Sequence, residues 1–290
     1  MTHPAEQLKQ LLAAGAIVQA PGAYDALSAR LVQRAGFEAI YMTGFGATAS
    51  RLGQPDIGLL TQTEMTTHAR DMTRAVTIPV IADADTGYGG PSNIERTVRE
   101  YVQAGVAAIH LEDQVAPKRC GQMAGIRLID ARENERRLRC ALQARGADPM
   151  LIIGRTDALP AADIDEAVAR ALRYQDAGVD LVFVDGIKRM AEVEAVARRV
   201  AGPKVVSIVD GTEAAGFSAT ELQAMGFTIV FHAVTALFAA ARAVEQALAA
   251  LRSHGTPNGL PQPGMSYAAF CDVVGLAPHQ RLDEAWGAPS

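Results

Sequence analysis

Short apolar segments with β-strand character alternate with amphipathic helical segments along most of this chain, and this alternation limits its fold more than any other feature. The segments are apolar throughout, which is typical of strands that are buried on both faces of a parallel sheet. Parallel neighbours need a crossover between them, usually a helix. The predicted strands span residues 17–20, 39–43, 78–82, 107–111, 151–154, 181–184, 205–209 and 228–231.

Helical segments fall before, between and after these strands, and several of them end in Ala-Gly directly ahead of an apolar strand, which is a typical helix stop. Eight β–α units predict an α/β fold of the (β/α)8 TIM-barrel type. A doubly wound open sheet is the alternative, because periodicity alone does not show that a sheet closes. The predicted helices span residues 5–14, 25–35, 63–74, 93–104, 131–144, 164–177, 191–200, 219–225 and 236–252.

The last segment of the chain differs in composition from the rest. Residues 253–290 are rich in Pro and Gly and include Tyr267, Phe270 and Trp286. We therefore predict a catalytic barrel domain over residues 1–252 and a C-terminal arm over residues 253–290. The arm is expected to pack on the barrel or on a neighbouring subunit.

Composition and charge exclude several classes of protein. The 290 residues are 49% hydrophobic and carry a formal charge of -5, with no long run of either sign. A folded protein with a small-molecule partner is expected, with no nucleic acid and no membrane as partner. Three widely spaced cysteines predict no disulfide framework. No export signal is recognised, and the longest apolar window, residues 227–241, is shorter than the roughly 20 residues of a membrane span. These features predict a cytoplasmic protein.

Polar residues follow the predicted strands where each strand ends. In a barrel these ends share one rim, and this rim carries the active site. Each residue alone has a structural explanation, such as Arg155 pairing with Asp157, but ionisable groups after five of six successive strands indicate a site. The residues at these ends are Thr43, Gly44, Phe45, Asp83, Asp85, Glu112, Asp113, Arg155, Asp185, Ser207 and Asp210.

The third strand ends in two carboxylates and a glycine turn. Asp83 and Asp85, with Glu112 after the fourth strand, supply oxygen ligands without accompanying histidines. This set favours Mg2+, with Mn2+ as the alternative, over zinc. A calcium loop of the EF-hand type is excluded, because counting from Asp83 places Ile94 at the twelfth position, where that loop requires Glu.

The glycines after the second strand allow two interpretations. Residues 44–49 fit the pattern GxGxxA of a dinucleotide site, with Glu64 as a candidate ribose ligand. We expect residues 51–55, which end in Gly-Gln-Pro, to interrupt any helix within a turn, and this disfavours a nucleotide. The preferred interpretation is that backbone N–H groups here bind a substrate carboxylate.

Cys120 lies in a loop after the fourth strand, between Arg119 and Gly121. The neighbouring Lys118 and Arg119 are expected to lower the pKa of the thiol, which makes Cys120 a candidate acid, base or nucleophile. His232, at a strand end, is a candidate for the pocket lining. Structural roles are expected for His68, His110, Cys140 and Cys271.

Five motifs occur together in one order, and the combination resembles the isocitrate lyase and phosphoenolpyruvate mutase superfamily. The similarity covers residues 15–255 and is strongest to the branch of 2-methylisocitrate lyase and the 2-alkylmalate lyases, such as 2,3-dimethylmalate lyase. The motifs are YMTGFG at 41–46, QPDIG at 54–58, DADTGYG at 83–89, HLEDQVAPKRCG at 110–121 and GRTDA at 154–158.

The resemblance implies a (β/α)8 barrel whose C-terminal helix is exchanged between the subunits of a dimer or tetramer. Mg2+ would bind Asp83 directly and Asp56, Asp85 and Glu112 mainly through water. Cys120, on a gating loop, would protonate a carbanion. The predicted catalytic residues are Tyr41, Lys118, Cys120 and Arg155. The predicted substrate-binding residues are Thr43, Gly44, Phe45, Gly121, Gln122, Asp185, Ser207 and Asp210.

The implied activity is Mg2+-dependent cleavage of a carbon–carbon bond in a 2-hydroxy di- or tricarboxylate, which gives an α-keto acid and a carboxylate. The sequence departs from the pattern of these lyases at Gln122, Ile126, Asp185 and Ser207. These changes spare the predicted metal ligands and alter the substrate pocket. The alternatives are an oxaloacetate hydrolase or decarboxylase, an enzyme of phosphonate P–C bonds, and a barrel that binds without turnover.

Overall fold

Eight parallel strands close into a barrel in the computed structural model, which describes residues 2–260 and 264–287. The first strand pairs with the last, with Val18 opposite Ile229, so the sheet has no free edge. This closure confirms the predicted (β/α)8 barrel and excludes the open sheet. All eight strands overlap their predicted segments: β1 Val18–Ala23, β2 Ile40–Met42, β3 Val80–Asp83, β4 Ala108–Leu111, β5 Leu151–Thr156, β6 Leu181–Val184, β7 Lys204–Ile208 and β8 Ile229–His232.

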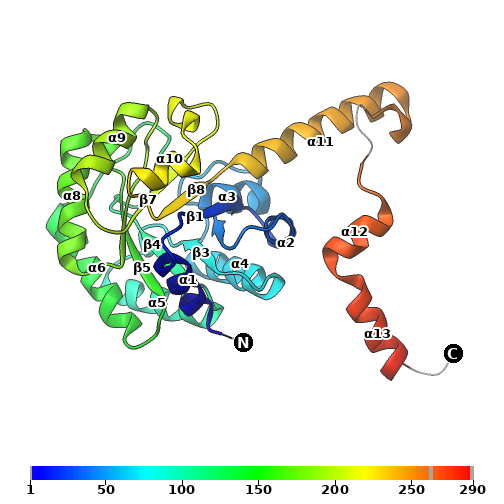
Figure 1. Cartoon of the computed structure of the whole chain (residues 1–290), viewed down its shortest axis with the longest axis horizontal. Coiled ribbons are helices and arrows are strands. Elements are labelled where there is room, and N and C mark those ends of the chain that lie inside the picture. The colour runs from blue at the N-terminus through cyan, green and yellow to red at the C-terminus, as the bar shows by residue number, and fades with distance from the viewer. Residues whose placement is uncertain (1, 261–263, 288–290) are drawn as a thin grey trace.

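Helices cover the outside of the barrel, as Figure 1 shows. Two of the predicted Ala-Gly stops are helix C-caps, where Gly105 and Gly178 take left-handed conformations with φ of 79° and 96°. The helices are α1 Pro4–Ala13, α2 Ala26–Arg34, α3 Gly44–Leu52, α4 Gln62–Ala75, α5 Pro91–Ala104, α6 Ala131–Arg145, α7 Ala158–Ala161, α8 Ile164–Ala177, α9 Met190–Arg199, α10 Ala219–Ala224, α11 Thr235–His254, α12 Tyr267–Val274 and α13 Leu276–Trp286, with short 3-10 turns η1 Glu213–Gly216 and η2 Pro257–Gly259.

Helix α3 was not predicted, and the expected interruption of any helix by residues 51–55 is wrong. The helix begins at Gly44, directly after β2, and reaches Leu52 before Gly53 ends it with a φ of 62°. The Thr43 side chain caps it by accepting a hydrogen bond from the Gly46 N–H at 3.3 Å. The breaking residues therefore lie at the end of this helix and not within its first turn.

The inside of the barrel is filled by apolar side chains and closed at the bottom by α1. Ala5 and Leu8 of α1 belong to the same buried cluster as the inward-facing strand residues. Nearer the carboxyl ends of the strands, the rings of Tyr41 and Phe231 stack with centroids 4.1 Å apart, and Phe183 meets Phe231 edge-on at 5.6 Å. This aromatic layer forms a floor beneath the polar residues at the strand ends.

The C-terminal helices extend away from the barrel, as Figure 1 shows. No side chain of α11 is buried within the part of the chain that the structure describes. Helix α12 returns to α2, where Arg30 Nη1 donates a hydrogen bond to the Val273 carbonyl oxygen at 3.4 Å. Residues 261–263 and 288–290 of the predicted arm lie outside the described residues. Among the described helices, none has the length and apolar character needed to cross a membrane.

Candidate active site

The carboxyl ends of the strands bring most of the predicted site residues around one cavity of about 100 Å³. Asp83 ends β3, Arg155 lies in β5 and Ser207 lies in β7, so residues far apart in sequence share one rim. The cavity is lined by the predicted residues Tyr41, Thr43, Phe45, Asp56, Asp83, Cys120, Gln122, Arg155, Asp185 and Ser207, together with Phe183, Val209, Ala233, Val234 and Phe238.

Lys118 is buried between two predicted metal ligands. Its Nζ lies 2.8 Å from Asp56 Oδ1 and 2.8 Å from Asp85 Oδ1. Burial would lower the pKa of Lys118, but the charges of Asp85 and Asp56 raise it well above its usual value, so the ammonium persists. Burial also raises the pKa of Asp85 to about 6 against the pull of Lys118, with the charge of Asp83 adding to the increase.

Asp83 is held by backbone groups on both carboxylate oxygens. Its Oδ1 accepts a hydrogen bond from the Asp85 N–H at 2.9 Å, and its Oδ2 accepts one from the Gly44 N–H at 3.3 Å. Burial alone would raise the pKa of Asp83, but interactions with His110 and Lys118 lower it to about 2. Asp83 is therefore a carboxylate across the physiological pH range.

Tyr41 and His110 form a buried polar pair beneath Asp83. The Tyr41 hydroxyl lies 3.1 Å from His110 Nε2, and His110 Nδ1 lies 3.7 Å from Asp83 Oδ1. Burial, followed by the charge of Asp83, raises the pKa of Tyr41 well above its usual value, so its hydroxyl stays protonated. His110, for which a structural role was predicted, connects the floor of the cavity to Asp83.

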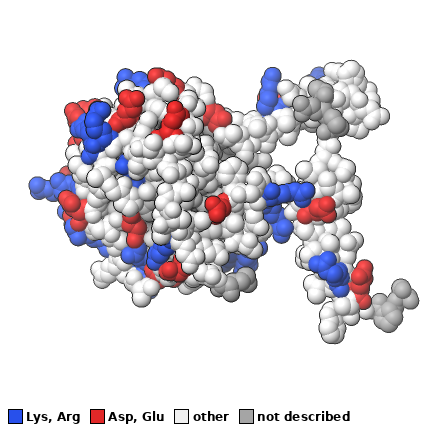
Figure 2. Space-filling model, in the orientation of Figure 1, with Lys and Arg blue, Asp and Glu red and all other residues white. Residues whose placement is uncertain are grey.

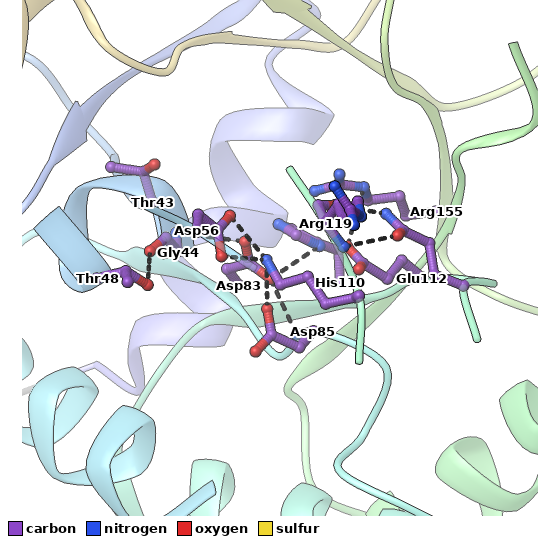
Figure 3. A network of polar contacts seen from close by, with 12 residues as sticks. Thr43, Gly44, Thr48, Asp56, Asp83, Asp85, His110, Glu112, Arg119 and Arg155 are labelled. Atoms are coloured by element: carbon purple, nitrogen blue, oxygen red, sulfur yellow. Dashed lines mark hydrogen bonds and ion pairs between the residues drawn. The ribbon is translucent and has the colours of Figure 1, made fainter. Parts of the chain in front are cut away.

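Arg155 contacts three carboxylates at once. Its Nη2 lies 2.8 Å from Asp157 Oδ1 and 2.6 Å from Asp185 Oδ2, and its Nε lies 3.4 Å from Glu112 Oε2. Figure 3 shows Glu112 and Arg155 pointing toward each other beside the aspartates. Arg155 also lies over the ring of Phe183 at 5.4 Å, so the aromatic floor fixes its position.

Neither oxygen of Glu112 accepts a hydrogen bond from the residues that the structure describes, although Arg155 Nε lies 3.4 Å from Oε2. Burial raises its pKa well above the usual value, although Arg155 opposes this increase. A buried carboxylate without donors is costly unless a cation or a proton compensates it. Arg155 is the only basic side chain within 4 Å of Glu112 among the described residues and donates no hydrogen bond to it, so both Glu112 oxygens are free to accept from a water or to bind a metal ion.

The oxygen-rich donor set fits Mg2+ when water completes the coordination. Within residues 2–260 and 264–287, no three His, Cys, Asp or Glu side chains are arranged closely enough to hold an ion by themselves. Mg2+ commonly keeps several waters and binds only one or two carboxylates directly. Asp83, Asp85, Asp56 and the donor-free Glu112 match that mode, and Figure 3 shows them gathered together.

The environment of Cys120 contradicts one prediction. Burial raises the pKa of its thiol to about 12, with further increases from Asp185 and Asp56, so the expected decrease is wrong. The reason is that the Lys118 ammonium is paired with carboxylates and the Arg119 side chain is exposed. The thiol keeps its proton near neutral pH, which suits an acid and disfavours a thiolate nucleophile.

Three other predicted substrate contacts are placed differently. Gln122 lines the cavity with its Nε2 buried and without an acceptor among the described residues, so this donor is free for a ligand. Gly121 packs directly against the Arg155 cluster, because a Cβ there would lie 2.6 Å from Asp157 Oδ1. Asp210 does not line the cavity: it is exposed and accepts a hydrogen bond from Thr235 Oγ1 at 2.8 Å.

An apolar wall was missed by the sequence analysis. Phe238, near the start of α11, meets Phe45 edge-on with ring centroids 6.3 Å apart, and Val209 and Val234 lie on the same cavity. In sequence these residues differ little from ordinary core residues. Val209 and Val234 lie within two residues of the ends of β7 and β8, and this position is the signal that could have identified them, whereas Phe238 lies further along, in the first turn of α11.

The glycine motif after β2 does not form a nucleotide site. The N-terminus of α3 faces the Asp83 carboxylate, and a Cβ on Gly44 would lie 2.5 Å from Asp83 Oδ2. Glu64, the candidate ribose ligand, instead accepts hydrogen bonds from Thr61 N and Oγ1 at 2.7 Å each in the capping box of α4. The small residue at 44 is thus needed for close approach of the helix to the buried carboxylate.

Buried carboxylates, a buried arginine and a thiol around one cavity at the strand ends of a barrel have the arrangement of an enzyme active site. Comparison with known proteins gives the family. The family model described as phosphoenolpyruvate phosphomutase matches residues 8–252. The chain is 39% identical over 274 residues to 2,3-dimethylmalate lyase of Eubacterium barkeri, which covers 94% of this chain and 95% of that protein. It is 37% identical over 280 residues to 2-methylisocitrate lyase of Bacillus subtilis (strain 168), and the aligned part covers 97% of this chain and 92% of that protein.

A solved structure agrees with these relatives. Oxaloacetate acetylhydrolase in complex with 3,3-difluorooxalacetate has a TM-score of 0.92 at 34% identity, over 99% of this chain and 98% of that chain. The chain belongs to the phosphoenolpyruvate phosphomutase family, within the superfamily shared with isocitrate lyase. The predictions of this superfamily and of a carbon–carbon lyase are confirmed.

Proposed function

We propose that the chain is a Mg2+-dependent lyase that cleaves a 2-hydroxy dicarboxylate of the 2-alkylmalate type, or a 2-methylisocitrate-like tricarboxylate, to an α-keto acid and a carboxylate. One observation carries the proposal: the protonated Cys120 thiol shares a cavity with Arg155 and the Asp83 carboxylate. These are an acid, an anion-binding group and a cation ligand. The similarity to two lyases supports the same reaction class.

The chain's own residues divide the chemistry between them. Asp83, with Asp56, Asp85 and Glu112, would hold the Mg2+, which when bound polarises the oxygens of the substrate. Arg155 binds a substrate carboxylate, and the free Gln122 amide donates a hydrogen bond to the substrate. The C2 hydroxyl gives its proton to a neighbouring carboxylate of the site and becomes the keto group as the C2–C3 bond breaks. The electron pair of that bond remains on C3, the carbon that belongs to the carboxylate product, and the Cys120 thiol supplies the proton to C3.

The lining of the cavity favours a substrate with an alkyl group over one with a third carboxylate. Arg155 is the one cationic side chain among the described lining residues, whereas Phe45, Val209, Val234 and Phe238 form an apolar wall. A third carboxylate against that wall would lose its hydration without gaining a partner. We therefore place 2-alkylmalates ahead of 2-methylisocitrate.

A panel assay tests the proposed reaction. The purified chain is incubated with Mg2+ and a set of 2-hydroxy acids that includes 2,3-dimethylmalate and 2-methylisocitrate, and the keto acid released is measured. Oxaloacetate is added to the panel, because the similarity to oxaloacetate acetylhydrolase makes its hydrolysis the second candidate. Release of a keto acid from an alkylmalate supports the proposal. Turnover of oxaloacetate alone, or none at all, would refute it.

We also propose that the C-terminal helices pack against a second copy of the chain. The large apolar side chains Val244, Leu248 and Leu251 of α11 are 45 to 60% exposed, and Trp286 of α13 is 86% exposed. Figure 2 shows charges of both signs mixed over the barrel and fewer of them, in separate small groups, on the projecting part. Sedimentation of the wild type and of Leu248→Glu tests this, since the variant should shift toward monomer.

A further inference from the structure

The loop that carries Cys120 is fixed at its base by the backbone. The Val115 N–H donates to the Arg127 carbonyl at 2.7 Å, and the Ile129 N–H donates to the Asp113 carbonyl at 2.9 Å. These bonds join the two ends of the loop next to β4. These two bonds do not reach the part of the loop around Cys120, which lines the cavity.

The side chain of Gln114 holds that part. Its Nε2 donates a hydrogen bond to the Arg119 carbonyl at 2.7 Å, and its Oε1 accepts one from the Arg119 N–H at 2.9 Å. Gln114 is 1% exposed, so these bonds are protected from water. One buried carboxamide thus binds both main-chain groups of a single loop residue, as a neighbouring strand would.

The two hydrogen bonds between Gln114 and the Arg119 backbone determine where the adjacent side chains lie. Lys118 is buried against Asp56, Arg119 is exposed and Cys120 lines the cavity, so the burial alternates about the residue that Gln114 holds. Fixing the backbone of Arg119 therefore directs the ammonium on one side and the thiol on the other into the site. A shift of this backbone would displace both groups.

Gln114 also reaches the substrate-binding arginine. Its Nε2 donates a second hydrogen bond to Asp157 Oδ2 at 3.0 Å, and Asp157 Oδ1 accepts one from Arg155 Nη2 at 2.8 Å. The loop backbone packs on the same cluster at Gly121, where a Cβ would lie 3.0 Å from Arg155 Nη2. The closed loop and the position of Arg155 thus share one buried connection.

We propose that Gln114 is a positioning residue that couples closure of the Cys120 loop to the placement of Arg155 through Asp157. In the closed loop, the Arg119 carbonyl oxygen and the Arg119 N–H bind the Gln114 carboxamide. They hold it in the orientation in which its Nε2 also donates to Asp157. Opening the loop removes both and frees the carboxamide to turn away from Asp157. The inference deepens the proposed function, because it assumes that Cys120 and Arg155 act on one substrate.

The test is the rate at which iodoacetamide labels Cys120 in the full-length chain, measured by mass spectrometry of its peptide. Gln114→Glu keeps the shape but loses both N–H donors and brings a carboxylate to Asp157. Gln114→Met removes the hydrogen bonds without adding charge. Gln114→Met loses all three hydrogen bonds, whereas Gln114→Glu loses the two that Nε2 donates and adds repulsion from Asp157. Each variant should therefore label Cys120 about tenfold faster or more. Labelling of Cys140 in the same sample is the internal control and should not change.

Arg119→Ala is the matched control. It removes an exposed side chain and leaves both main-chain bonds to Gln114, so its labelling rate should equal that of the wild type. In the active enzyme, the Gln114 variants should lower kcat and also raise KM, because both Cys120 and Arg155 are displaced. A general loss of stability would instead lower the apparent kcat and leave KM unchanged, since it only reduces the amount of folded enzyme. Wild-type labelling rates in both folded Gln114 variants would overturn the inference. Because labelling needs no substrate, it decides this point even if the proposed reaction is not found.

Discussion

Asp113, directly after β4, offers a sharp test of how this barrel is held together under its active site. Its carboxylate is fully buried and accepts four hydrogen bonds. The Oδ2 atom accepts from Thr156 Oγ1 at 2.7 Å, Tyr174 OH at 2.8 Å and Arg170 Nη1 at 3.1 Å. The Oδ1 atom accepts from the Asp157 N–H at 2.9 Å. Asp113 thereby connects the ends of β4 and β5 with α8.

The expected cost of Asp113→Ala follows from these contacts. Breaking a buried ion pair costs about 3–5 kcal/mol, and each buried hydroxyl left without a partner costs about 1–3 kcal/mol. Arg170 keeps its bonds to Glu166 and to the Ile129 carbonyl, which places the ion-pair cost at the lower end. With about 3 kcal/mol for the ion pair and about 1–3 kcal/mol for each of the hydroxyls of Thr156 and Tyr174, we expect a loss of about 5–9 kcal/mol in the free energy of unfolding. This is a large part of the usual stability of a domain.

Glu166→Ala is the matched control, because Glu166 pairs with the same guanidinium at 2.7 Å but its side chain is 42% exposed. An exposed i,i+4 pair contributes about 0.3–0.5 kcal/mol. Urea unfolding followed by circular dichroism at one protein concentration measures both variants. Asp113→Asn retains one acceptor oxygen, so its free energy of unfolding should fall by about half as much as that of Asp113→Ala. If Asp113→Ala does not fold, Asp113→Asn replaces it in the comparison with Glu166→Ala. Equal stability of Asp113→Ala and Glu166→Ala would refute the reasoning.

Three further predictions concern the site itself. Cys120→Ser should lower kcat about 100-fold or more, because a serine hydroxyl is a much weaker acid, whereas Cys140→Ser should leave kcat unchanged in the same keto-acid assay. Gly121→Ala should hold the loop away from the Arg155 cluster and lower kcat, because its Cβ would collide with Asp157, whereas Gly90→Ala has free space and should have no effect. Mg2+ should raise the melting temperature of the wild type more than that of Glu112→Gln, because the variant removes one charge from the proposed ligand set; equal shifts would contradict a role of Glu112 in Mg2+ binding.

The strands could be predicted from the sequence because most of their residues are apolar and each strand is followed by a helix. The two ends of the barrel meet through contacts between residues such as Val18 and Ile229, which no local pattern reveals. Helix α3 was missed because Gly-Gln-Pro was placed within a turn of its start, whereas Thr43 caps a helix that ends just before these residues. The helix-breaking residues Gly53 and Pro55 therefore indicate where this helix ends, but they do not show that no helix forms before them.

The site was predictable as a list of residue types, but the state of each group was not. Flanking cations in the sequence suggested a thiolate at Cys120, but Lys118 turns to Asp56 and Asp85 and leaves the thiol among carboxylates. The role of Gln114 was also hidden, because it depends on which backbone groups the loop presents to it. A motif gives the residue types of a site. The directions of the side chains, which decide what each group contacts, depend on the tertiary structure and could not be predicted from the motif.

The balance of charge around the cavity connects stability with function. Carboxylates outnumber cations here, and burial opposes the charged form of each one. Arg155 is shared by three of them, Lys118 by two, and Glu112 keeps both oxygens without a donor among the described residues. Such an arrangement lowers the free energy of unfolding unless a further cation binds. A cation that binds only the folded state raises the free energy of unfolding, and the increase is larger when the cation binds more tightly. The same excess of carboxylates that makes the site costly to fold is therefore what would make it select a divalent metal.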